Sequence, residues 1–315
     1  MFHAVNLQKQ SNEKSIAFIF HEPIKFSDSE LLEAREVFSE VFIIKKSFRF
    51  FNIFKNYLFI KLKTQNINIK NLYVGTIGVN LLVLLYKKLK AQNKYLLEDG
   101  FETLAFSIQG VDYFNNDKSF IARKLFKHYF FLKNKKYKII SFMSISNNVL
   151  ETIKVNLSDK ENLKNKNPTY TNDLLIIGSN ALDSNLLNMK NTEYSLLRLI
   201  KFHKDKYNIK KVIYRPHPRE PIWCSEYLID KFNMTLFDND SKYTIFENFI
   251  INANTFPKYV CSIFPSSLFF TIPQITSCIK LSIYNFDDNA YLKYTDRILL
   301  VKKHLEKLDT INFVK

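Results

Sequence analysis

Short apolar runs alternate with longer helical patterns along the first half of the chain. The runs "SIAFIFHEP" (15–23), "NLYVG" (71–75) and "KYLLEDG" (94–100) are predicted to be strands. Helical periodicity covers residues 28–42, which begin with an Asp/Ser start signal, and residues 78–90. Strands that alternate with helices favour a parallel sheet covered by helices.

The same alternation returns in the second half. An amphipathic helix is predicted for residues 193–207, and strands are predicted in "LLIIGSNAL", "KVIYRPHPRE", "YVCSIFPSSLFFTI" and "CIKLSIY". The stretch before them, "NLSDKENLKNKNPTYTND", is polar, lacks apolar periodicity and is typical of a linker. We therefore predict an α/β protein with two Rossmann-like domains, residues 1–155 and 173–315, joined by a linker at 156–172. Their parallel sheets should face each other across a ligand cleft at the carboxyl ends of the strands.

Composition indicates a globular protein with an anionic partner. The chain has 315 residues, of which 46% are hydrophobic, so it is not disordered. Lys and Arg exceed Asp and Glu by 16 (46 against 30). Such an excess favours nucleic acid, a membrane surface or a phosphate-bearing ligand as partner. Asn, Ile, Lys and Phe are abundant throughout, so the background of an AT-rich genome explains the excess equally well.

The three cysteines and the polar amino terminus indicate the cellular compartment of the protein. Cys224, Cys261 and Cys278 form no CxxC pair, which predicts buried thiols in a reducing environment. Residues 1–10 lack the apolar core of a signal peptide, so we expect a cytoplasmic protein. The most apolar run, 74–86, is too short to span a bilayer and is predicted to be a buried helix.

Three loops at the carboxyl ends of predicted strands carry candidate chemistry: "EDG" (98–100), "PHP" (216–218) and "PSS" (265–267). In an open α/β sheet such loops line one crevice. His217 lies between two prolines and beside Arg215 and Arg219. Imidazole titrates near neutral pH, so it can hold or donate a proton to a phosphate. The alternative is a structural histidine.

The two other loops also have two readings each. Ser266 and Ser267 precede an apolar helix-like run, so one of them is a natural N-cap. The same geometry also makes an anion site. Asp99 is a candidate general base, and because side chains alternate along a strand, Glu98 should point the other way. As an ordinary turn, "EDG" would have no catalytic role.

We predict no metal site. Asp238-Asn239-Asp240 matches the short DxD pattern, but the match lies in a polar loop and is frequent by chance. "GTIG" (75–78) lacks the spacing of a phosphate-binding loop or a dinucleotide fingerprint.

The ordered set of loops resembles the bacterial sialyltransferases, and glycosyltransferase family 52 in particular, over residues 71–280. The motifs of that group are matched here by Glu98-Asp99-Gly100, His217-Pro218 and Ser266-Ser267. Glu247 in "YTIFENFI" is similar to the family's acidic residue at a helix start. Family members usually begin with a strand, whereas residues 1–10 here are predicted to be helical.

The resemblance implies a two-domain GT-B fold and a metal-independent, inverting sialyltransferase without a cofactor. The donor would be CMP-sialic acid, and the acceptor a glycan or glycolipid such as lipooligosaccharide or capsule. It implies that Asp99 is the base, that His217 is the acid or a phosphate ligand, and that Glu247 contacts the ribose. Ser266 and Ser267 would bind the phosphate. Asp183 in "GSNALDSN" is the alternative base.

Two other classes stay open. A transferase of the CDP-glycerol type also uses histidine and serine motifs to hold a cytidine nucleotide, although Arg219 and Glu220 after Pro218 favour the sialyltransferase. A basic nucleic-acid-binding protein is disfavoured because the lysines are dispersed and no known nucleic-acid module is present. We expect peripheral contact with an anionic membrane surface and no nucleic-acid partner, and the resemblance also admits a homodimer.

Overall fold

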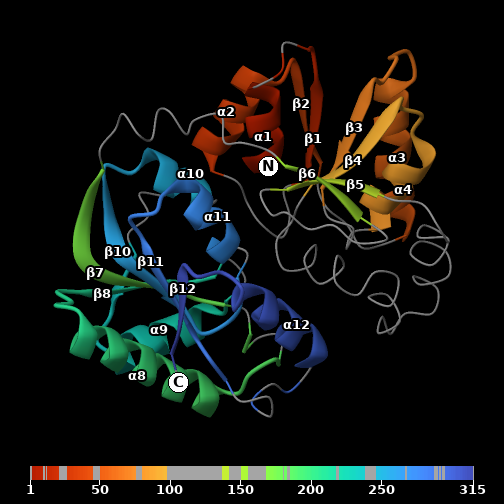
Figure 1. Cartoon of the computed structure of the whole chain (residues 1–315). Coiled ribbons are helices and arrows are strands. Elements are labelled where there is room, and N and C mark those ends of the chain that lie inside the picture. Colours follow the sequence, from red (N-terminus) through yellow and green to blue (C-terminus); the bar gives the residue numbers. More distant parts are fainter. Residues whose placement is uncertain are drawn as a thin grey trace. The chain divides into compact units, whose positions relative to one another are not determined.

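The computed structural model describes two compact units. They comprise Met1–Pro23 with Leu31–Ser158, and Ile24–Glu30 with Asp159–Lys315. The residues that the structure describes are 2–9, 11, 13–20, 27–44, 50–75, 80–97, 137–141, 150–154, 168–179, 181–182, 185–217, 220–237, 246–266, 268–286, 290, 292 and 295–314. Both units combine helices with parallel strands, so the predicted α/β class with a parallel sheet in each half is confirmed (Figure 1).

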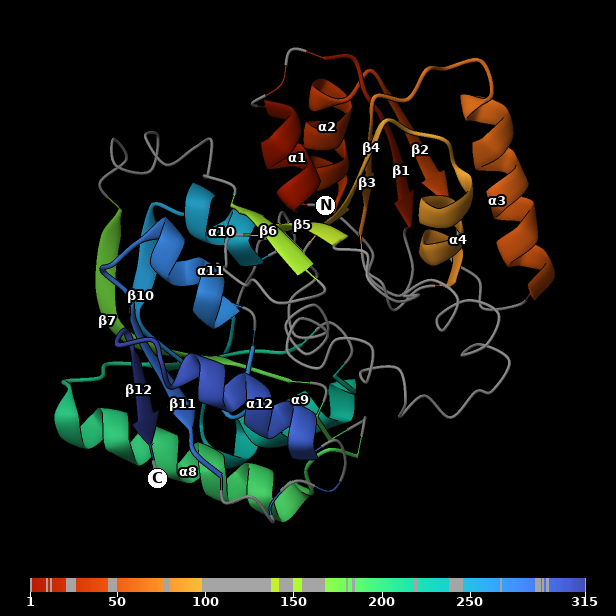
Figure 2. The ribbon, with the colours of Figure 1, turned by 45° about the vertical axis from the view of Figure 1, so that its right-hand side comes forward.

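The first unit contains a two-stranded and a four-stranded parallel sheet. Strand β1 pairs with β2, and the larger sheet has the order β3-β4-β5-β6. The strands are β1 (Ile16–Phe20), β2 (Glu40–Ile44), β3 (Asn71–Val74), β4 (Asn93–Leu97), β5 (Tyr137–Ser141) and β6 (Leu150–Lys154). The helices described in this unit are α1 (Phe2–Lys9), α2 (Asp28–Val37), which belongs to it from Leu31 onward, α3 (Phe50–Thr64) and α4 (Asn80–Lys88). Helices α3 and α4 lie side by side in both views (Figures 1 and 2).

One predicted helix is shorter than expected. The pattern predicted a helix through residue 42, but α2 ends at Val37 and residues 40–44 form strand β2. Residues 41–44 are "VFII", which suits a strand better than a helix. Phe42 lies opposite Phe18 of β1, and their rings stack with centroids 5.2 Å apart. Pairing with a remote strand therefore decides the state of this segment.

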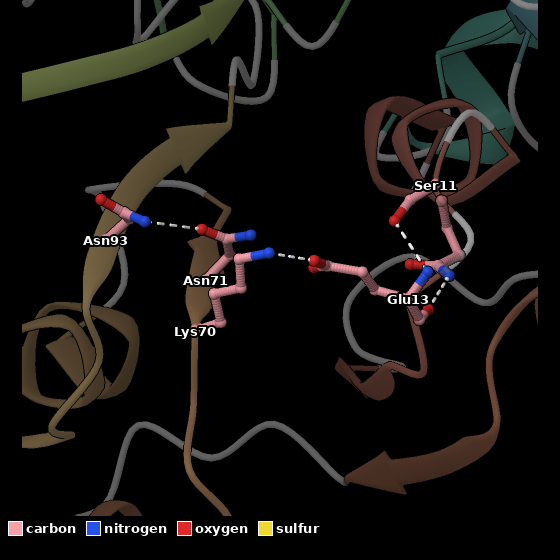
Figure 3. Close-up of polar contacts among 6 residues, drawn as sticks. Ser11, Glu13, Lys70, Asn71 and Asn93 are labelled. Atoms are coloured by element: carbon pink, nitrogen blue, oxygen red, sulfur yellow. Dashed lines mark hydrogen bonds and ion pairs between the residues drawn. The ribbon is translucent and has the colours of Figure 1, made fainter.

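The core of the first unit forms where α3 and α4 meet strand β2. Its buried side chains are Ile44, Ile53, Ile60, Leu81, Leu85 and Leu89. Leu81 and Leu85 belong to the run that was predicted to be a buried helix, and α4 confirms that prediction. Near β3, Lys70 forms an ion pair with Glu13, and the amide of Asn93 donates to Asn71 Oδ1 at 3.0 Å (Figure 3). The ion pair joins the segment before β1 to the residue before β3, and the hydrogen bond joins the first residues of β3 and β4.

The second unit is built on a six-stranded parallel sheet in the order β12-β11-β10-β7-β8-β9. Read from β7, the chain moves outward through β8 and β9, then returns to the other side of β7 for β10, β11 and β12. This is the order of a doubly wound nucleotide-binding fold, whose switch point here is between β7 and β10. The strands are β7 (Thr169–Ile177), β8 (Val212–Arg215), β9 (Thr235–Leu236), β10 (Thr255–Ser262), β11 (Lys280–Tyr284) and β12 (Ile311–Val314).

Helices cover both faces of this sheet. They are α8 (Met189–Lys206), α9 (Ile222–Lys231), α10 (Phe246–Asn252), α11 (Leu268–Ile275) and α12 (Thr295–Leu305). Helices α8 and α9 lie on one face, and α10 and α11 lie on the other (Figure 1). Residues 174–177 of β7 are accordingly buried without alternation, which is typical of a central parallel strand.

Strand β7 begins inside the predicted linker. Residues 169–172 were assigned to the linker because they are polar, yet Thr169 and Tyr170 pair with Thr255 and Phe256 of β10. The ladder satisfies backbone groups whatever the side chains are, so a polar stretch can extend a strand when a neighbouring strand is available. The β7–β10 register shifts between Pro257 and Tyr259, as expected for a proline in a central strand.

None of the helices formed by the described residues is both long and apolar enough to cross a bilayer. Cys224 and Cys261 are buried, as predicted, but Cys278 is exposed. Cys278 lies in the turn before β11, where no element covers it.

His203 is a buried histidine that joins α8 to β11. Its Nδ1 donates to the carbonyl of Leu199 at 2.8 Å, so its Nε2, 3.1 Å from Ser282 Oγ, accepts from that hydroxyl. Burial lowers the pKa of His203 below its usual value. The folded protein therefore holds this side chain neutral.

We expect His203 to make folding stability depend on pH. As pH falls below about 6.5, the unfolded chain takes up a proton on this residue before the folded one does. Stability should therefore be full above that pH and decline below it, by at most about 1.4 kcal/mol per pH unit. Urea denaturation between neutral and mildly acidic pH measures the slope. A shallower slope is expected for His203→Gln; equal slopes in wild type and His203→Gln would contradict the assignment.

Candidate functional site

The carboxyl ends of β8, β7 and β10 form the candidate site of the second unit. These strands are neighbours, and Ile177 at the end of β7 lies opposite both Arg215 of β8 and Ser262 of β10. The three loops that follow hold Gly178 and Ser179, then His217, then Ser266. Residues from three distant parts of the chain thus meet at the edge of the sheet where the strand order reverses. Ligands of doubly wound folds bind at such an edge.

Glu220 holds the His217 loop in place. One carboxylate oxygen accepts from the backbone N–H of His217 at 3.0 Å, and the other accepts from the Tyr214 hydroxyl at 2.6 Å. The Glu220 N–H in turn donates to the His217 carbonyl at 2.8 Å. These bonds close a tight turn directly after β8. The backbone position of His217 is therefore determined by a buried network as well as by its flanking prolines.

Gly178 makes room for that network. Its N–H donates to the Arg215 carbonyl at 2.8 Å, so the loop after β7 packs directly on the loop after β8. A Cβ at position 178 would overlap the Glu220 carboxylate and lie 2.8 Å from Tyr214 Oη. Only glycine fits here without a shift of the neighbours. The local residue pattern around Gly178 does not indicate this role.

The electrostatics of Glu220 follow from its burial. Burial raises the pKa of its carboxyl group, while the hydrogen bonds from Tyr214 and His217 act in the opposite direction. Burial also raises the pKa of the neighbouring Cys224 thiol to about 11, so this thiol is neutral and is a poor nucleophile. Both carboxylate oxygens of Glu220 already accept hydrogen bonds, so Glu220 acts as a support of the loop.

Arg215 ends β8 on the opposite face of the sheet from Tyr214. Its guanidinium carbon lies 4.6 Å from the centre of the Phe246 ring, a cation–π distance. Burial lowers the pKa of Arg215 to about 10, and the negative charge of Glu247 opposes that shift. Burial likewise raises the pKa of Glu247, and Arg215 opposes it. Glu247 lies in the first turn of α10. Its charge interacts with that of Arg215, the last residue of β8, which lies two residues before His217.

Ser266 lies at the start of α11. Its hydroxyl accepts from the Leu268 N–H at 3.3 Å, and its carbonyl accepts from the Phe269 N–H at 3.2 Å. This is the helix-capping geometry that the sequence suggested for one of the two serines. A turn at Ser262 precedes it, where one hydroxyl donates to the Phe264 carbonyl and accepts from the Phe264 N–H.

Several predicted site residues lie outside the described residues. They are Glu98, Asp99, Gly100, Asp183, Pro218, Arg219, Asp238, Asp240 and Ser267. Strand β4 ends at Leu97, directly before the "EDG" stretch. The structure therefore brings together the His217 and Ser266 loops, while the roles of Asp99, Asp183 and Ser267 stay predictions. Within the described ranges, no group of three or more His, Cys, Asp or Glu side chains is arranged to hold a metal ion.

No protein-family model matches the sequence, and no curated protein is significantly similar to it. Two solved structures are similar in fold at low identity. One is a glycosyltransferase from Rickettsia africae ESF-5, with 14% identity over 90% of this chain and 76% of that chain, and a TM-score of 0.48. The other is a UDP-GlcNAc 2-epimerase from Methanocaldococcus jannaschii, with 12% identity over 95% of this chain and 94% of that one, and a TM-score of 0.41.

Proposed function

We propose that the chain is a metal-independent, inverting glycosyltransferase that uses a CMP-activated sialic acid or a related nonulosonic acid. The acceptor would be a cell-surface glycan such as lipooligosaccharide or capsule. The observation that carries the proposal is the meeting of the His217 and Ser266 loops on either side of Gly178, at the switch point of a doubly wound sheet. That edge is the nucleotide-binding edge of such folds.

The local chemistry suits a phosphate. A hydroxyl and the start of a helix at Ser266 offer hydrogen-bond donors and a partial positive charge. His217 adds an imidazole after the end of β8, on the other side of β7, and Arg215, which interacts with the charge of Glu247, precedes it at the end of β8. The carboxyl group of Glu220 lies nearby, and burial raises its pKa, which disfavours its charged form. Its oxygens face the Tyr214 hydroxyl and the His217 N–H.

The proposed reaction assigns one step to each group. Asp99, or Asp183 in its place, accepts the proton of the acceptor hydroxyl as that oxygen bonds to the anomeric carbon. The bond from this carbon to the phosphate oxygen breaks, and CMP leaves with the electron pair. His217 donates a proton or a hydrogen bond to the departing phosphate, while Ser266 and Ser267 stabilise its charge. Glu247 would bind the ribose of the donor.

Nucleotide binding is the direct test. We expect calorimetry on the full chain to detect CMP and CMP-sialic acid, and to find UDP much weaker. A charge-assisted hydrogen bond contributes about 1.5–3 kcal/mol, so Ser266→Ala should weaken CMP binding by roughly tenfold to 100-fold. Ser277→Ala is the matched control because Ser277 follows the opposite end of α11 and is exposed.

Each other result points away from the proposal. A preference for CDP over CMP and CMP-sialic acid would indicate a transferase of the CDP-glycerol type. Salt-sensitive duplex binding without any nucleotide binding would indicate a nucleic-acid-binding protein. If Ser266→Ala and Ser277→Ala change CMP affinity equally, the start of α11 is not the phosphate site.

A further inference from the structure

Helix α3 presents apolar side chains on two faces. One face contributes Ile53 and Ile60 to the core shared with α4. Phe54, Leu58 and Leu62 lie on the other face and are 51%, 39% and 63% exposed. They are spaced four residues apart, so they form a single stripe along the helix. A surface helix normally carries polar residues on that face, so the core does not explain this stripe.

A groove lies next to the stripe, between α3 and α4. Its volume is about 1000 Å³, and its apolar lining includes Phe54, Tyr57 and Leu84. Lys61, Lys88 and Lys90 also line it. The two helices lie side by side in both views, and the groove involves residues of the first unit only (Figures 1 and 2). The stripe and the groove together form one face, which we call the α3–α4 face.

The charge of this part of the chain has a single sign. Residues 41–97 contain ten Lys and one Arg, and neither Asp nor Glu. Lys70 is paired with Glu13 (Figure 3), and Lys63 lies over the Phe42 ring. Lys55, Lys61, Lys88 and Lys90 are exposed on the α3–α4 face and its edges. Positive charge is thus concentrated where apolar side chains are exposed.

A second exposed apolar group, on α9, has different surroundings. Ile222 and Trp223 of α9 are 74% and 63% exposed. Acidic side chains lie near them: Glu226 and Asp230 are on the same helix, and Glu193 accepts a hydrogen bond from Tyr227 at 2.6 Å. The lysine of this helix, Lys231, forms an ion pair with Glu193 at 2.6 Å, so the acidic groups outnumber it. An anionic surface would be attracted to the α3–α4 face and not to α9. Charge complementarity therefore separates the two.

We propose that the α3–α4 face binds the surface of an anionic phospholipid bilayer. Phe54, Leu58 and Leu62 insert at the boundary between headgroups and acyl chains, and the surrounding lysines bind the headgroup phosphates. The combination of an apolar stripe with a one-sided positive charge is what an interfacial helix requires. The proposal is independent of the transfer reaction, because no residue of this face belongs to the candidate nucleotide site.

Vesicle sedimentation with the full chain tests the proposal. We expect binding to vesicles of phosphatidylcholine with phosphatidylglycerol, little binding to phosphatidylcholine alone, and weaker binding at high salt. Lys61→Ala/Lys88→Ala should lower the partition coefficient by about 30-fold, since each lysine near such a surface contributes about a factor of five. Leu58→Ser/Leu62→Ser should lower it by roughly tenfold or more because less apolar surface is buried.

Matched controls lie in the second unit. Ile222→Ser/Trp223→Ser removes two exposed apolar side chains, and Lys204→Ala/Lys211→Ala removes two exposed lysines with the same change in net charge. Neither pair should change the partition, and circular dichroism should show that all four variants are folded. Equal binding to neutral and anionic vesicles would overturn the proposal, as would control pairs that act as strongly as the α3–α4 pairs. A shift from dimer to monomer in Leu58→Ser/Leu62→Ser without vesicles would make this face a protein interface instead.

Discussion

Asp99→Asn is expected to lower the turnover of the proposed sialyl transfer by about 10²–10⁴-fold, the usual contribution of a positioned general base. The acceptor hydroxyl must lose its proton as it attacks, and asparagine keeps the size of the side chain but cannot take up that proton. Asp99 follows the end of β4 at Leu97, and the carboxyl ends of parallel strands are where substrates bind in α/β sheets. Steady-state kinetics with CMP-sialic acid and a glycan acceptor measures the effect.

Nucleotide affinity and a neighbouring carboxylate supply the controls for Asp99. CMP affinity by calorimetry should be nearly unchanged in Asp99→Asn, since the base acts in the transition state and not in donor binding. Glu98→Gln should have a much smaller effect, because the proposal assigns the base to Asp99 alone. An active Asp99→Asn together with an inactive Asp183→Asn would move the base to the second unit.

Gly178→Ala is expected to destabilise the second unit by about 1–3 kcal/mol, the usual cost of forcing an extra carbon into a packed site. The added Cβ would meet the Glu220 carboxylate and Tyr214 Oη, which together hold the His217 loop. These groups must shift, so CMP affinity should fall together with stability. Urea denaturation followed by circular dichroism measures the first effect, and calorimetry measures the second.

Gly75→Ala is the matched control for Gly178. A Cβ at position 75 would have Leu82 Cδ1 as its nearest neighbour at 3.7 Å, an ordinary contact. This variant should therefore stay within about 0.5 kcal/mol of wild type. If Gly178→Ala unfolds no more easily than Gly75→Ala, the Glu220 network can give way without cost, and its role in holding His217 is refuted.

Local patterns in the sequence were sufficient for the class of the fold and for many of its elements. A strand that is buried on both faces has a continuous apolar run, and residues 174–177 show one. A helix that is buried on one face has apolar residues at helical spacing, and residues 193–207 show that pattern. The loops with His217 and Ser266 could also be assigned to strand ends. Prolines and serines mark where a strand stops through their own backbone and side-chain chemistry.

Contacts between distant segments decided the rest. Residues 40–44 became a strand, and residues 169–173 extended one, because each found a partner strand whose backbone completed its hydrogen bonds. The residue pattern of either segment does not show which strand it will pair with. In the same way, packing against α4 determines which face of α3 is buried, and therefore which apolar side chains stay exposed.

For the candidate site too, some features could be predicted from the sequence and others depend on the tertiary structure. The residue types at 217, 220 and 266 are properties of the sequence, and their chemistry could be judged from it. That Glu220 supports His217, that Gly178 is needed for this contact, and that Ser266 lies across β7 from His217 follow from the strand order β10-β7-β8. Strand order depends on which apolar faces pack together over the whole unit, a long-range property that the spacing of residues along the chain does not record.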